Sequence, residues 1–400
     1  MKGNKLKDHR ELGRELDLFL FDEISPGSAF WLPKGMIIFK QLEKFIRETI
    51  DNRGYQEIST PIIAKSELFK KSGHWQFFKD NMFNFKVDNE DYSIKPMNCP
   101  ESTIVFSSKT RSYKDLPLRF SEFGRLHRNE RSGTLNGMFR VRQMVMDDAH
   151  VFCTPGQIQA EITEMLDITL DLYKKLNLPI TFGLATRPKK AMGEEKTYRD
   201  AEVQLSKALK SHNIDFKMLE GEGAFYGPKI HIDFKDFLDR AWTLATIQVD
   251  FLMPKSLGIS YAAQSGKEET PVMIHRAILG SFERFVGIMC EQYQGAFPLW
   301  LAPIQVIVLP ITDGQLSYAQ IVAKALTREN IRTEVDAQNE TLQAKIRNAA
   351  MQKIPYLLVV GAKEEKAKTV AVRTRIGKDL GQMNLDDFTG KIISEIENKT

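Results

Sequence analysis

The sequence is poor in cysteine, since its 400 residues include only Cys99, Cys153 and Cys290. Three cysteines cannot build the disulfide framework of a small secreted domain. No apolar run approaches the roughly eighteen residues of a membrane-spanning helix, so none is expected. The N-terminal stretch is polar and charged and lacks the apolar segment of a secretory signal. These features favour a cytoplasmic protein with no membrane partner.

Common nucleotide-binding signatures are missing as well. The chain has neither a Walker A run nor the glycine pattern of a dinucleotide-binding fold. The glycine-rich run GEGAFYG at residues 221–227 is more typical of a turn than of a phosphate cradle. There are no internal repeats and no low-complexity segments. If the protein binds ATP, the site must therefore be of another type.

Length and patterning predict two domains. Residues 1–301 show antiparallel hairpins between helices, which predicts an α+β domain with a large antiparallel sheet. The pattern changes near Leu301–Pro303. Residues 302–400 alternate between strands and helices, which predicts a small α/β domain with a mostly parallel sheet. The net charge of +4 is compatible with an RNA partner without identifying one.

The spacing of apolar residues places the main elements. In the first domain it predicts helices over 35–53, 156–176, 196–211 and 276–293, a strand within 55–63, a long hairpin over 117–149, and strands at 229–234 and 245–251. In the second domain it predicts strands at 304–310, 331–335 and 356–361, with helices at about 315–329 and 341–352.

The hairpin over 117–149 carries charges along strands that should otherwise be buried. Arg128 and Glu130 are two residues apart and share a strand face, and so do Arg140 and Arg142. Arginines on a sheet suit a polyphosphate, because the guanidinium group binds phosphate oxygens through two parallel hydrogen bonds. A solvated hairpin with cross-strand ion pairs is the alternative interpretation, and the pattern alone favours it.

Three short motifs, taken in order, resemble those of the class II aminoacyl-tRNA synthetases. Motif 1 in that family is a helix followed by a strand ending in proline, and GYQEISTP with Pro61 fits it. Motif 2 is an Arg-x-Glu strand, a loop and a return strand, and Arg128-Asn129-Glu130 fits. Motif 3 is a strand and a helix that carries an arginine, and HRAILGSFERF with Arg284 fits.

Longer runs are similar to the threonyl-tRNA synthetase family. They are KSGHW, KPMNCP, DLPLRF, HRNE, DDAHVFCT, GEGAFYGPKI, PVMIHRAILGSFERF and AVRTRIGKDLG. The similarity runs from about residue 8 to the C-terminus and does not include the N-terminal editing region of that family. It implies a class II catalytic domain over 1–301 and an anticodon-binding domain over 302–400. The implied activity is threonine–tRNA ligation: ATP and L-threonine give threonyl-adenylate, and the threonyl group passes to tRNA(Thr).

The resemblance also implies a zinc ion. One cysteine and two histidines hold it in the family, and the matching positions are Cys99, His150 and His275. Their spacing alone would not have predicted a metal site. Three protein ligands leave zinc an open position, which the family uses to bind the amino group and β-hydroxyl of threonine. A site built to bind a hydroxyl rejects an analogue that lacks it, such as valine.

Other roles follow from the resemblance alone. The residues implied to bind the amino acid are Asp148 for its hydroxyl, with Tyr226, Lys229 and Met146 lining the pocket. The residues implied at ATP are Arg128, Glu130, Arg140, Met144, Gln248 and Arg284, of which Arg128, Glu130 and Arg284 form the catalytic set, with Mg²⁺ bridging the phosphates. The residues implied to read the anticodon are Asn339, Arg347, Glu364 and Arg373, for which an ordinary solvated surface is the alternative. A homodimer formed through motif 1 is expected.

Departures from the family pattern gather near the implied pocket. They are Glu101-Ser102 for Gly-His, Gln143 for Gly, Met144 for Phe, Met146 for Gln, and Thr243-Leu244-Ala245 for Gln-Cys-Gly. Three interpretations follow. The protein is a working threonyl-tRNA synthetase, such as an inhibitor-insensitive duplicate; a paralogue that activates threonine or a related amino acid for another acceptor; or a catalytically weak tRNA-binding protein. The matches at the implied zinc, ATP and anticodon positions favour the first.

Overall fold

The structure is a computed structural model that describes residues 6–236 and 239–399. These residues form two compact units, each considered by itself. The large unit consists of Phe21–Ala29 and Ile46–Phe285. The small unit consists of the described residues up to Leu20, the segment Phe30–Phe45, and the described residues from Val286 onward. Within the described residues, no helix is both long and apolar enough to cross a membrane.

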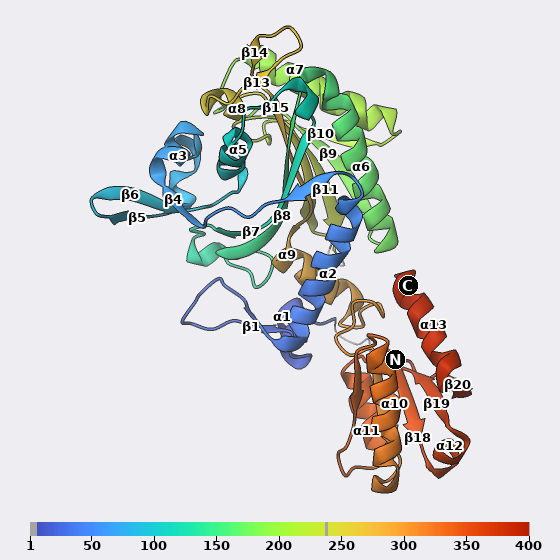
Figure 1. Ribbon diagram of the computed structural model, residues 1–400. Coiled ribbons are helices and arrows are strands. Elements are labelled where there is room, and N and C mark those ends of the chain that lie inside the picture. The colour runs from blue at the N-terminus through green and yellow to red at the C-terminus, as the bar shows by residue number, and fades with distance from the viewer. Residues whose placement is uncertain (1–5, 237–238, 400) are drawn as a thin grey trace. The chain divides into compact units, whose positions relative to one another are not determined.

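An eight-stranded sheet organises the large unit (Figure 1) and has the strand order β10-β9-β11-β12-β15-β8-β7-β3. Its strands are β3 (Tyr55–Glu57), β7 (Leu118–His127), β8 (Gln143–Cys153), β9 (Ile180–Ala185), β10 (Phe216–Leu219), β11 (Lys229–Lys235), β12 (Ala241–Asp250) and β15 (Val272–Ser281). All neighbours are antiparallel except the outer pairs β3–β7 and β9–β10, which are parallel. The predicted α+β class with an antiparallel sheet is confirmed.

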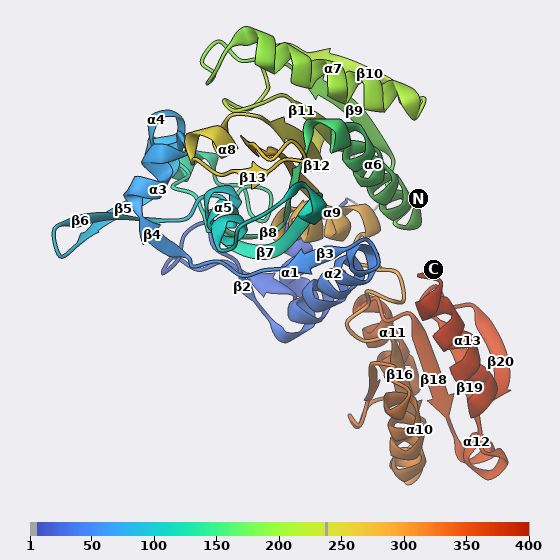
Figure 2. The ribbon, with the colours of Figure 1, turned by 45° about the horizontal axis from the view of Figure 1, so that its top comes forward.

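Helices cover this sheet on both faces. Helices α6 (Ile158–Lys175) and α7 (Glu195–Ser211) lie beside each other against one face (Figure 2). Arg119 of β7 points to that face, because its guanidinium binds Glu161 of α6 at 2.6 Å. Helix α5 (Cys99–Ser107) lies on the opposite face of the sheet. The residue before this helix, Asn98, lies against Gly124 of β7. Gly124 is an odd number of positions from Arg119, so the two residues point to opposite faces.

The remaining elements of the large unit are short. They are β4 (Ile63–Lys65), β5 (Phe83–Val87) and β6 (Glu90–Ile94), which form a three-stranded sheet, the pair β13 (Tyr261–Ala262) and β14 (Glu268–Glu269), and helices α3 (Ser66–Lys71), α4 (His74–Phe78) and α8 (Met253–Ser256). The predicted strand within 55–63 ends at Glu57, so Pro61 lies between β3 and β4.

Helices α2 (Pro33–Asp51) and α9 (Phe282–Tyr293) span the division between the units. Proline is well suited to the first position of α2, and Gly54 follows the helix with a φ of 71°. The predicted helix over 276–293 is wrong in its first part, because residues 276–281 belong to β15. Every residue from Val272 to Gly280 is buried, and the spacing of a mostly apolar run does not distinguish a central strand from a helix.

A five-stranded sheet, in the order β17-β16-β18-β19-β20, forms the core of the small unit. The strands are β16 (Val306–Pro310), β17 (Thr333–Val335), β18 (Tyr356–Val360), β19 (Thr369–Thr374) and β20 (Asp379–Asn384). The first three are parallel, as predicted, but β19 and β20 add an antiparallel edge that the sequence analysis missed. The helices are α10 (Leu316–Arg328), α11 (Leu342–Met351), α12 (Ala362–Ala367) and α13 (Leu385–Glu397).

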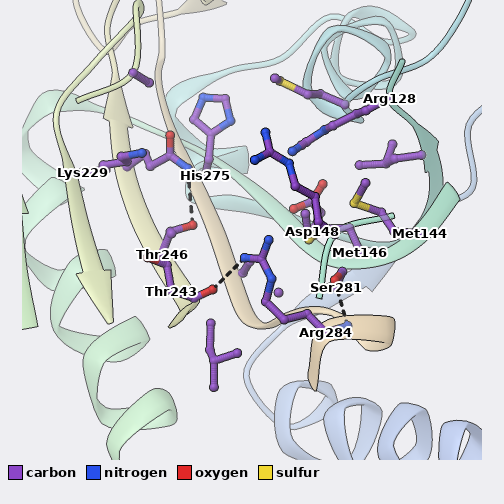
Figure 3. A pocket seen from close by; sticks show the side chains of 18 of the residues that line it. Arg128, Met144, Met146, Asp148, Lys229, Thr243, Thr246, His275, Ser281 and Arg284 are labelled. Carbon is purple, nitrogen blue, oxygen red and sulfur yellow. Dashed lines mark hydrogen bonds between the residues drawn. The ribbon is translucent and has the colours of Figure 1, made fainter. Parts of the chain in front are cut away.

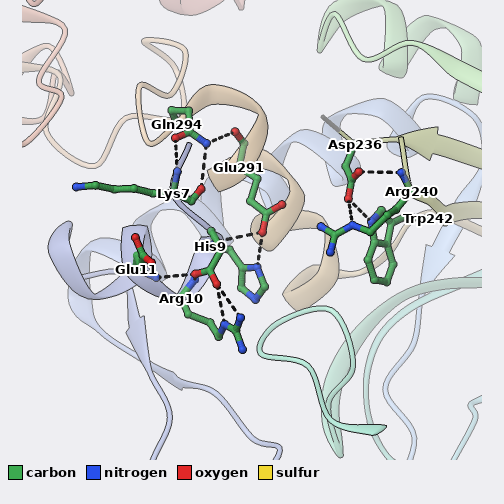
Figure 4. Close-up of polar contacts among 10 residues, drawn as sticks. Lys7, His9, Arg10, Glu11, Asp236, Arg240, Trp242, Glu291 and Gln294 are labelled. Atoms are coloured by element: carbon green, nitrogen blue, oxygen red, sulfur yellow. Dashed lines mark hydrogen bonds and ion pairs between the residues drawn. The ribbon is translucent and has the colours of Figure 1, made fainter. Parts of the chain in front are cut away.

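The N-terminal elements α1 (His9–Glu15), β1 (Phe19–Leu20) and β2 (Phe30–Trp31) also belong to the small unit. The buried ring of His9 lies with Nδ1 2.7 Å from Oε1 of Glu291, and the backbone N–H of His9 donates to the same oxygen (Figure 4). The backbone N–H of Lys7 donates to Gln294 at 2.9 Å. These contacts attach the N-terminal segment to the last turns of α9.

Candidate active site

A cavity of about 720 Å³ opens on the α5 face of the large sheet. Every residue that the sequence analysis assigned to the amino acid, to ATP or to the metal lines it. They are Cys99, Arg128, Glu130, Arg140, Met144, Met146, Asp148, His150, Tyr226, Lys229, Gln248, His275 and Arg284. Figure 3 labels Arg128, Met144, Met146, Asp148, Lys229, His275 and Arg284 among them. Their convergence is a result of the fold, because these residues are spread over almost two hundred positions of the chain.

Strand pairing explains how these residues meet. Alternate residues of a strand share a face, so Met146, Asp148 and His150 of β8 point into the cavity together. The register sets His150 opposite His275 of β15. His275 in turn pairs with Gln248 of β12, which pairs with Lys229 of β11. The central strands therefore place one row of polar side chains across the cavity floor.

Cys99, His150 and His275 form a group that fits a metal ion. One potential ligand atom from each lies within 4.8 Å of the others, and all three residues are buried. Tetrahedral bonds of about 2.0–2.3 Å separate ligand atoms by about 3.3–3.8 Å, so a small contraction would complete the geometry. Two imidazoles and a thiolate suit a borderline-soft divalent cation.

Burial controls the protonation of this group. Desolvation holds the pKa of His150 well below its usual range, which leaves the imidazole neutral and able to bind a cation. Desolvation also raises the pKa of the Cys99 thiol well above its usual range, so the thiolate needs a cation beside it. His275 Nε2 lies 3.1 Å from the buried carboxylate of Asp250, an arrangement that fixes the ring orientation. No motif in the sequence indicated Asp250 as a site residue.

A third histidine lies beside the metal-type group. His74 is fully buried, with Nε2 3.7 Å from Cys99 Sγ and 3.1 Å from Met97 Sδ. Its other ring nitrogen contacts Ser72 Oγ at 2.8 Å. Desolvation lowers the pKa of His74 to about 3, so its ring is neutral at physiological pH. The run KSGHW contains His74, but the family resemblance implied no role for this residue.

Asp148 and Tyr226 supply hydrogen-bonding groups next to the metal-type group. Asp148 accepts a hydrogen bond from Asn98 Nδ2 at 2.7 Å, and burial raises the pKa of its carboxyl group to about 6. The hydroxyl of Tyr226 donates to Gln248 Oε1 at 2.8 Å, and its ring stacks on His275 at a centroid distance of 4.9 Å. An amine and a hydroxyl on one small molecule would both find partners here.

Three arginines give the cavity positive charge. Arg128, Arg140 and Arg284 all line it (Figure 3 shows Arg128 and Arg284). Burial, and after it the charges of Arg128 and Arg140, lower the pKa of Arg284. Like charges held this close favour a polyanion between them. Arg140 forms an ion pair with Glu130 at 2.8 Å, so these two residues contact each other.

Backbone carbonyls and an aromatic platform hold Arg284. Its Nε donates to Phe139 O at 3.1 Å. One terminal nitrogen donates to Thr243 O, also at 3.1 Å (Figure 3). Its guanidinium lies 5.9 Å from the centroid of Trp242. Trp242 is held by Asp236, which accepts from the indole N–H at 2.8 Å (Figure 4). The position of Arg284 is therefore fixed by neighbouring groups.

Two irregularities in the sheet bring the Thr243 carbonyl and Arg284 together. The pairing of β11 with β12 shifts register between Ile232 and Asp233, and the pairing of β15 with β8 shifts between Ala277 and Ser281. Gly280, in the second irregularity, has a φ of 72°, and an added Cβ would lie 2.4 Å from Leu244 O. Bulges commonly turn side chains toward a site, as both do here.

The departures from the family pattern divide into two groups. Met144, Met146, Thr243 and Leu244 line the cavity. The others, Glu101, Ser102, Gln143 and Ala245, do not line it. Ser102 Oγ donates to Cys99 O at 2.8 Å, and Gln143 lies 3.3 Å from His127, so these two have local partners. Only the first group bears directly on what the cavity binds.

The residues expected to read an anticodon lie in the small unit, one in a loop and three on different elements. Asn339 lies before α11, Arg347 on α11, Glu364 on α12 and Arg373 on β19. Asn339 and Arg347 are exposed. Glu364 accepts from the backbone N–H of Gly361 at 3.0 Å, and Arg373 lies 3.5 Å from Asp379. Their role as an RNA-reading set stays a prediction.

Comparison with known proteins assigns the chain to a family. Residues 83–293 match the class II tRNA synthetase core domain (G, H, P, S and T), and residues 305–395 match an anticodon binding domain. Threonine–tRNA ligases of Legionella pneumophila and Alkalilimnicola ehrlichii are 50% and 49% identical over 98% of this chain. The chain spans 62% and 61% of their lengths, respectively.

A solved structure gives the same result. The RNA binding domain of threonyl-tRNA synthetase from Cryptosporidium parvum superposes with a TM-score of 0.94 at 41% identity, covering 97% of this chain and 98% of that one. The similarity thus extends over both the eight-stranded and the five-stranded sheets. The chain therefore belongs to the threonyl-tRNA synthetase family of class II aminoacyl-tRNA synthetases.

Proposed function

We propose that this chain activates L-threonine with ATP and transfers the threonyl group to the 3′ end of tRNA(Thr). One observation carries the proposal: the Cys99–His150–His275 group and Asp148 open onto the same cavity as Arg128 and Arg284. An amino acid that carries a hydroxyl and a nucleotide that carries phosphates can therefore lie next to each other. The family assignment supports the same activity.

Zinc is the cation that we propose for the metal-type group, held by Cys99, His150 and His275. When bound, it supplies a Lewis-acidic open position for the amino group and β-hydroxyl of the substrate. Asp148 accepts a hydrogen bond from that hydroxyl, and Tyr226, Lys229 and Met146 border the amino acid. Discrimination against valine follows, because an analogue without the hydroxyl leaves these polar groups unpaired.

The arginines carry the first chemical step. A carboxylate oxygen of threonine attacks the α-phosphorus of ATP, the bond to the β-phosphate oxygen breaks, and pyrophosphate leaves. Arg128 neutralises the α-phosphate and orients the carboxylate, Arg140 reaches the γ-phosphate, and Arg284 covers the adenine. No general base is needed, because the attacking group is already an anion. Mg²⁺ bound to the phosphates adds charge neutralisation.

Glu130, Met144 and Gln248 complete the nucleotide site in this proposal. Glu130 accepts from the adenine amino group once it is released from Arg140, with which it forms an ion pair here. Met144 packs against the base through its polarisable thioether. In the second step a hydroxyl oxygen of the terminal ribose of tRNA attacks the threonyl carbonyl carbon. The bond from that carbon to the phosphate oxygen breaks, AMP leaves, and the hydroxyl proton passes to the departing phosphate.

The small unit supports tRNA as the acceptor. We propose that residues 302–400 form an anticodon-binding domain that uses Asn339, Arg347, Glu364 and Arg373. A second candidate function is activation of threonine or a related amino acid for another acceptor. Met146 favours it, because this apolar side chain lies on the same face of β8 as Asp148, next to the proposed amino-acid site.

We also propose a cytoplasmic homodimer. The cysteines Cys99, Cys153 and Cys290 are free and buried, as suits a reducing compartment. Strand β3, which follows the helix of motif 1, lies at one edge of the eight-stranded sheet and offers that edge to a second copy. Sedimentation of the purified chain tests this, and a monomer at micromolar concentration would contradict it.

Amino-acid-dependent ATP–pyrophosphate exchange tests the proposed activity. Exchange should be fastest with threonine among the twenty amino acids, and threonine should then be transferred to tRNA(Thr). The absence of exchange with every amino acid would overturn the proposal. Threonine-dependent exchange without transfer to any tRNA would instead favour the second candidate function.

A further inference from the structure

Asn98, directly before helix α5, does not cap that helix. Asparagine at this position normally accepts a hydrogen bond from a backbone N–H of the first turn. Here the fully buried Asn98 side chain makes no such bond. Its Nδ2 instead donates to Asp148 Oδ2 at 2.7 Å, across fifty positions of the chain. The side chain therefore serves the cavity rather than the helix.

Gly124 of β7 leaves the room that this amide occupies. An added Cβ at Gly124 would lie 2.1 Å from Asn98 Oδ1 and 2.2 Å from Nδ2. The backbone of Gly124 does not have a positive φ, so its conformation does not require glycine. The structural reason for glycine at this position is therefore the Asn98 amide above it.

Asp148 needs a donor of this kind because of its neighbour across the sheet. The register sets Glu122 of β7 directly opposite Asp148 on β8, and like charges in that position repel. Glu122 is satisfied by Lys95 Nζ at 2.9 Å and by Thr60. Asn98 provides the corresponding contact for Asp148, because its amide holds one oxygen of the Asp148 carboxylate. Asp148 itself lines the cavity.

We propose that Asn98 and Gly124 act together as positioning residues that determine amino-acid specificity. Asn98 fixes the Asp148 carboxylate so that its second oxygen accepts from the substrate β-hydroxyl, and Gly124 admits the Asn98 amide. The inference rests on the proposed function, in which Asp148 binds that hydroxyl.

The first test compares threonine with 2-aminobutyrate, which has hydrogen in place of the hydroxyl. In Asn98→Ala, kcat/KM for threonine-dependent pyrophosphate exchange should fall roughly 10–100-fold, the range for a lost hydrogen bond to a charged group. The value for 2-aminobutyrate and the KM for ATP should change little. Asn98→Asp keeps the shape but removes the N–H donor, so it should lose at least as much. An equal loss for both amino acids would overturn the proposal.

The second test is a mutant cycle with Gly124. Gly124→Ala should push the amide away from Asp148 and reproduce the selective loss for threonine. In Asn98→Ala/Gly124→Ala the methyl group meets no amide, so the double variant should resemble Asn98→Ala alone. Gly156→Ala is the matched control, because the nearest atom to its added Cβ is 4.0 Å away. Gly156 does not line the cavity. Losses that add in the double variant would contradict the proposal.

Zinc content, measured on each purified variant, separates positioning from metal binding. Unchanged zinc with a selective loss for threonine supports the proposal, and loss of zinc from Asn98→Ala overturns it. Wild-type protein without threonine-dependent exchange would refute the proposed function itself. Wild-type exchange together with unaltered selectivity in both single variants would refute only this inference.

Discussion

At the scale of single residues, the cavity depends on groups whose chemistry is changed by burial. Cys99 and His150 are both inside the protein, where the uncharged thiol and the uncharged imidazole are favoured. A cation reverses the preference of the thiol, because the thiolate then has a partner.

Replacement of Cys99 tests the metal assignment. In Cys99→Ser the zinc content of the purified protein should fall sharply, and threonine-dependent exchange should fall by at least about 100-fold, since changes to outer-shell partners alone cost 10–100-fold. Metal analysis and exchange assays on the same preparation measure both. Cys153→Ala is the control, because it removes another buried thiol of the same unit that does not belong to the metal-type group. Exchange by metal-free Cys99→Ser would contradict the assignment.

The sequence identified most single residues of the site only through the family resemblance. Cys99, His150 and His275 are too far apart in the chain for their spacing to indicate a metal site. Asp250 and Asn98 were missed for a different reason. Asp250 contacts His275 from a neighbouring strand, and Asn98 contacts Asp148 from the start of a helix. A local sequence pattern does not indicate contacts between residues so far apart in the chain.

At the scale of elements, the sheet irregularities matter more than the regular strands. The bulges in β12 and β15 place Thr243 O, Gly280 and Ser281 around Arg284. Regular pairing could be predicted from alternating residues, as in the hairpin over 117–149. The bulges could not, because they depend on which neighbouring strand each backbone meets. The helix predicted over 276–293 was wrong over residues 276–281 for the same reason, since β15 lies between two neighbouring strands.

Gly280 tests whether close approach of the two bulges is required. In Gly280→Ala the positive φ and the contact with Leu244 O should together lower the free energy of unfolding of the large unit by about 1–3 kcal/mol. Urea unfolding followed by tryptophan fluorescence measures the change. Gly156→Ala, which has a normal φ and open space, should change it little. Equal midpoints for the two variants would contradict this account.

Thr243 tests whether the bulge in β12 positions Arg284. The Thr243 hydroxyl donates to Asp233 Oδ1 at 2.6 Å, and its carbonyl accepts from Arg284. Thr243→Val removes the hydroxyl at nearly constant volume. The KM for ATP should rise about tenfold, which corresponds to about 1.4 kcal/mol, while the KM for threonine should change little.

Asp233 provides the matched variants for this prediction. Asp233→Asn keeps an oxygen that accepts from the Thr243 hydroxyl, so it should resemble the wild type more than Asp233→Ala does. Adding Thr243→Val to Asp233→Ala should cause little further loss, because the same hydrogen bond is already absent. Independent, additive losses would show that the hydroxyl does not act through Asp233.

At the scale of the whole molecule, two compact units hold different sets of predicted residues. The large unit holds every predicted residue for the amino acid, ATP and the metal, and the small unit holds every predicted anticodon residue. The predicted boundary at residues 301 and 302 stays a prediction. The described N-terminal helix α1 belongs to the small unit through His9 and Glu291, a long-range contact that the sequence does not reveal.

This separation predicts that activation and tRNA recognition can be impaired independently. Arg347 is exposed on α11, so its loss should leave the large unit intact. In Arg347→Ala, kcat/KM for charging tRNA(Thr) should fall roughly tenfold, the scale of one lost base contact. Threonine-dependent pyrophosphate exchange without tRNA should stay at the wild-type rate.

Arg328→Ala on α10 is the matched control, because it removes an equally charged and exposed side chain from the same unit. A loss that is equal in the two variants would point to general attraction of tRNA by positive charge. Charging assays at several ionic strengths then distinguish a contact with a base from general attraction by positive charge. A contact with a base should keep its tRNA preference as salt rises, whereas a charge effect should weaken for all tRNAs together. A fall in exchange without tRNA in Arg347→Ala would show that the two units do not act independently.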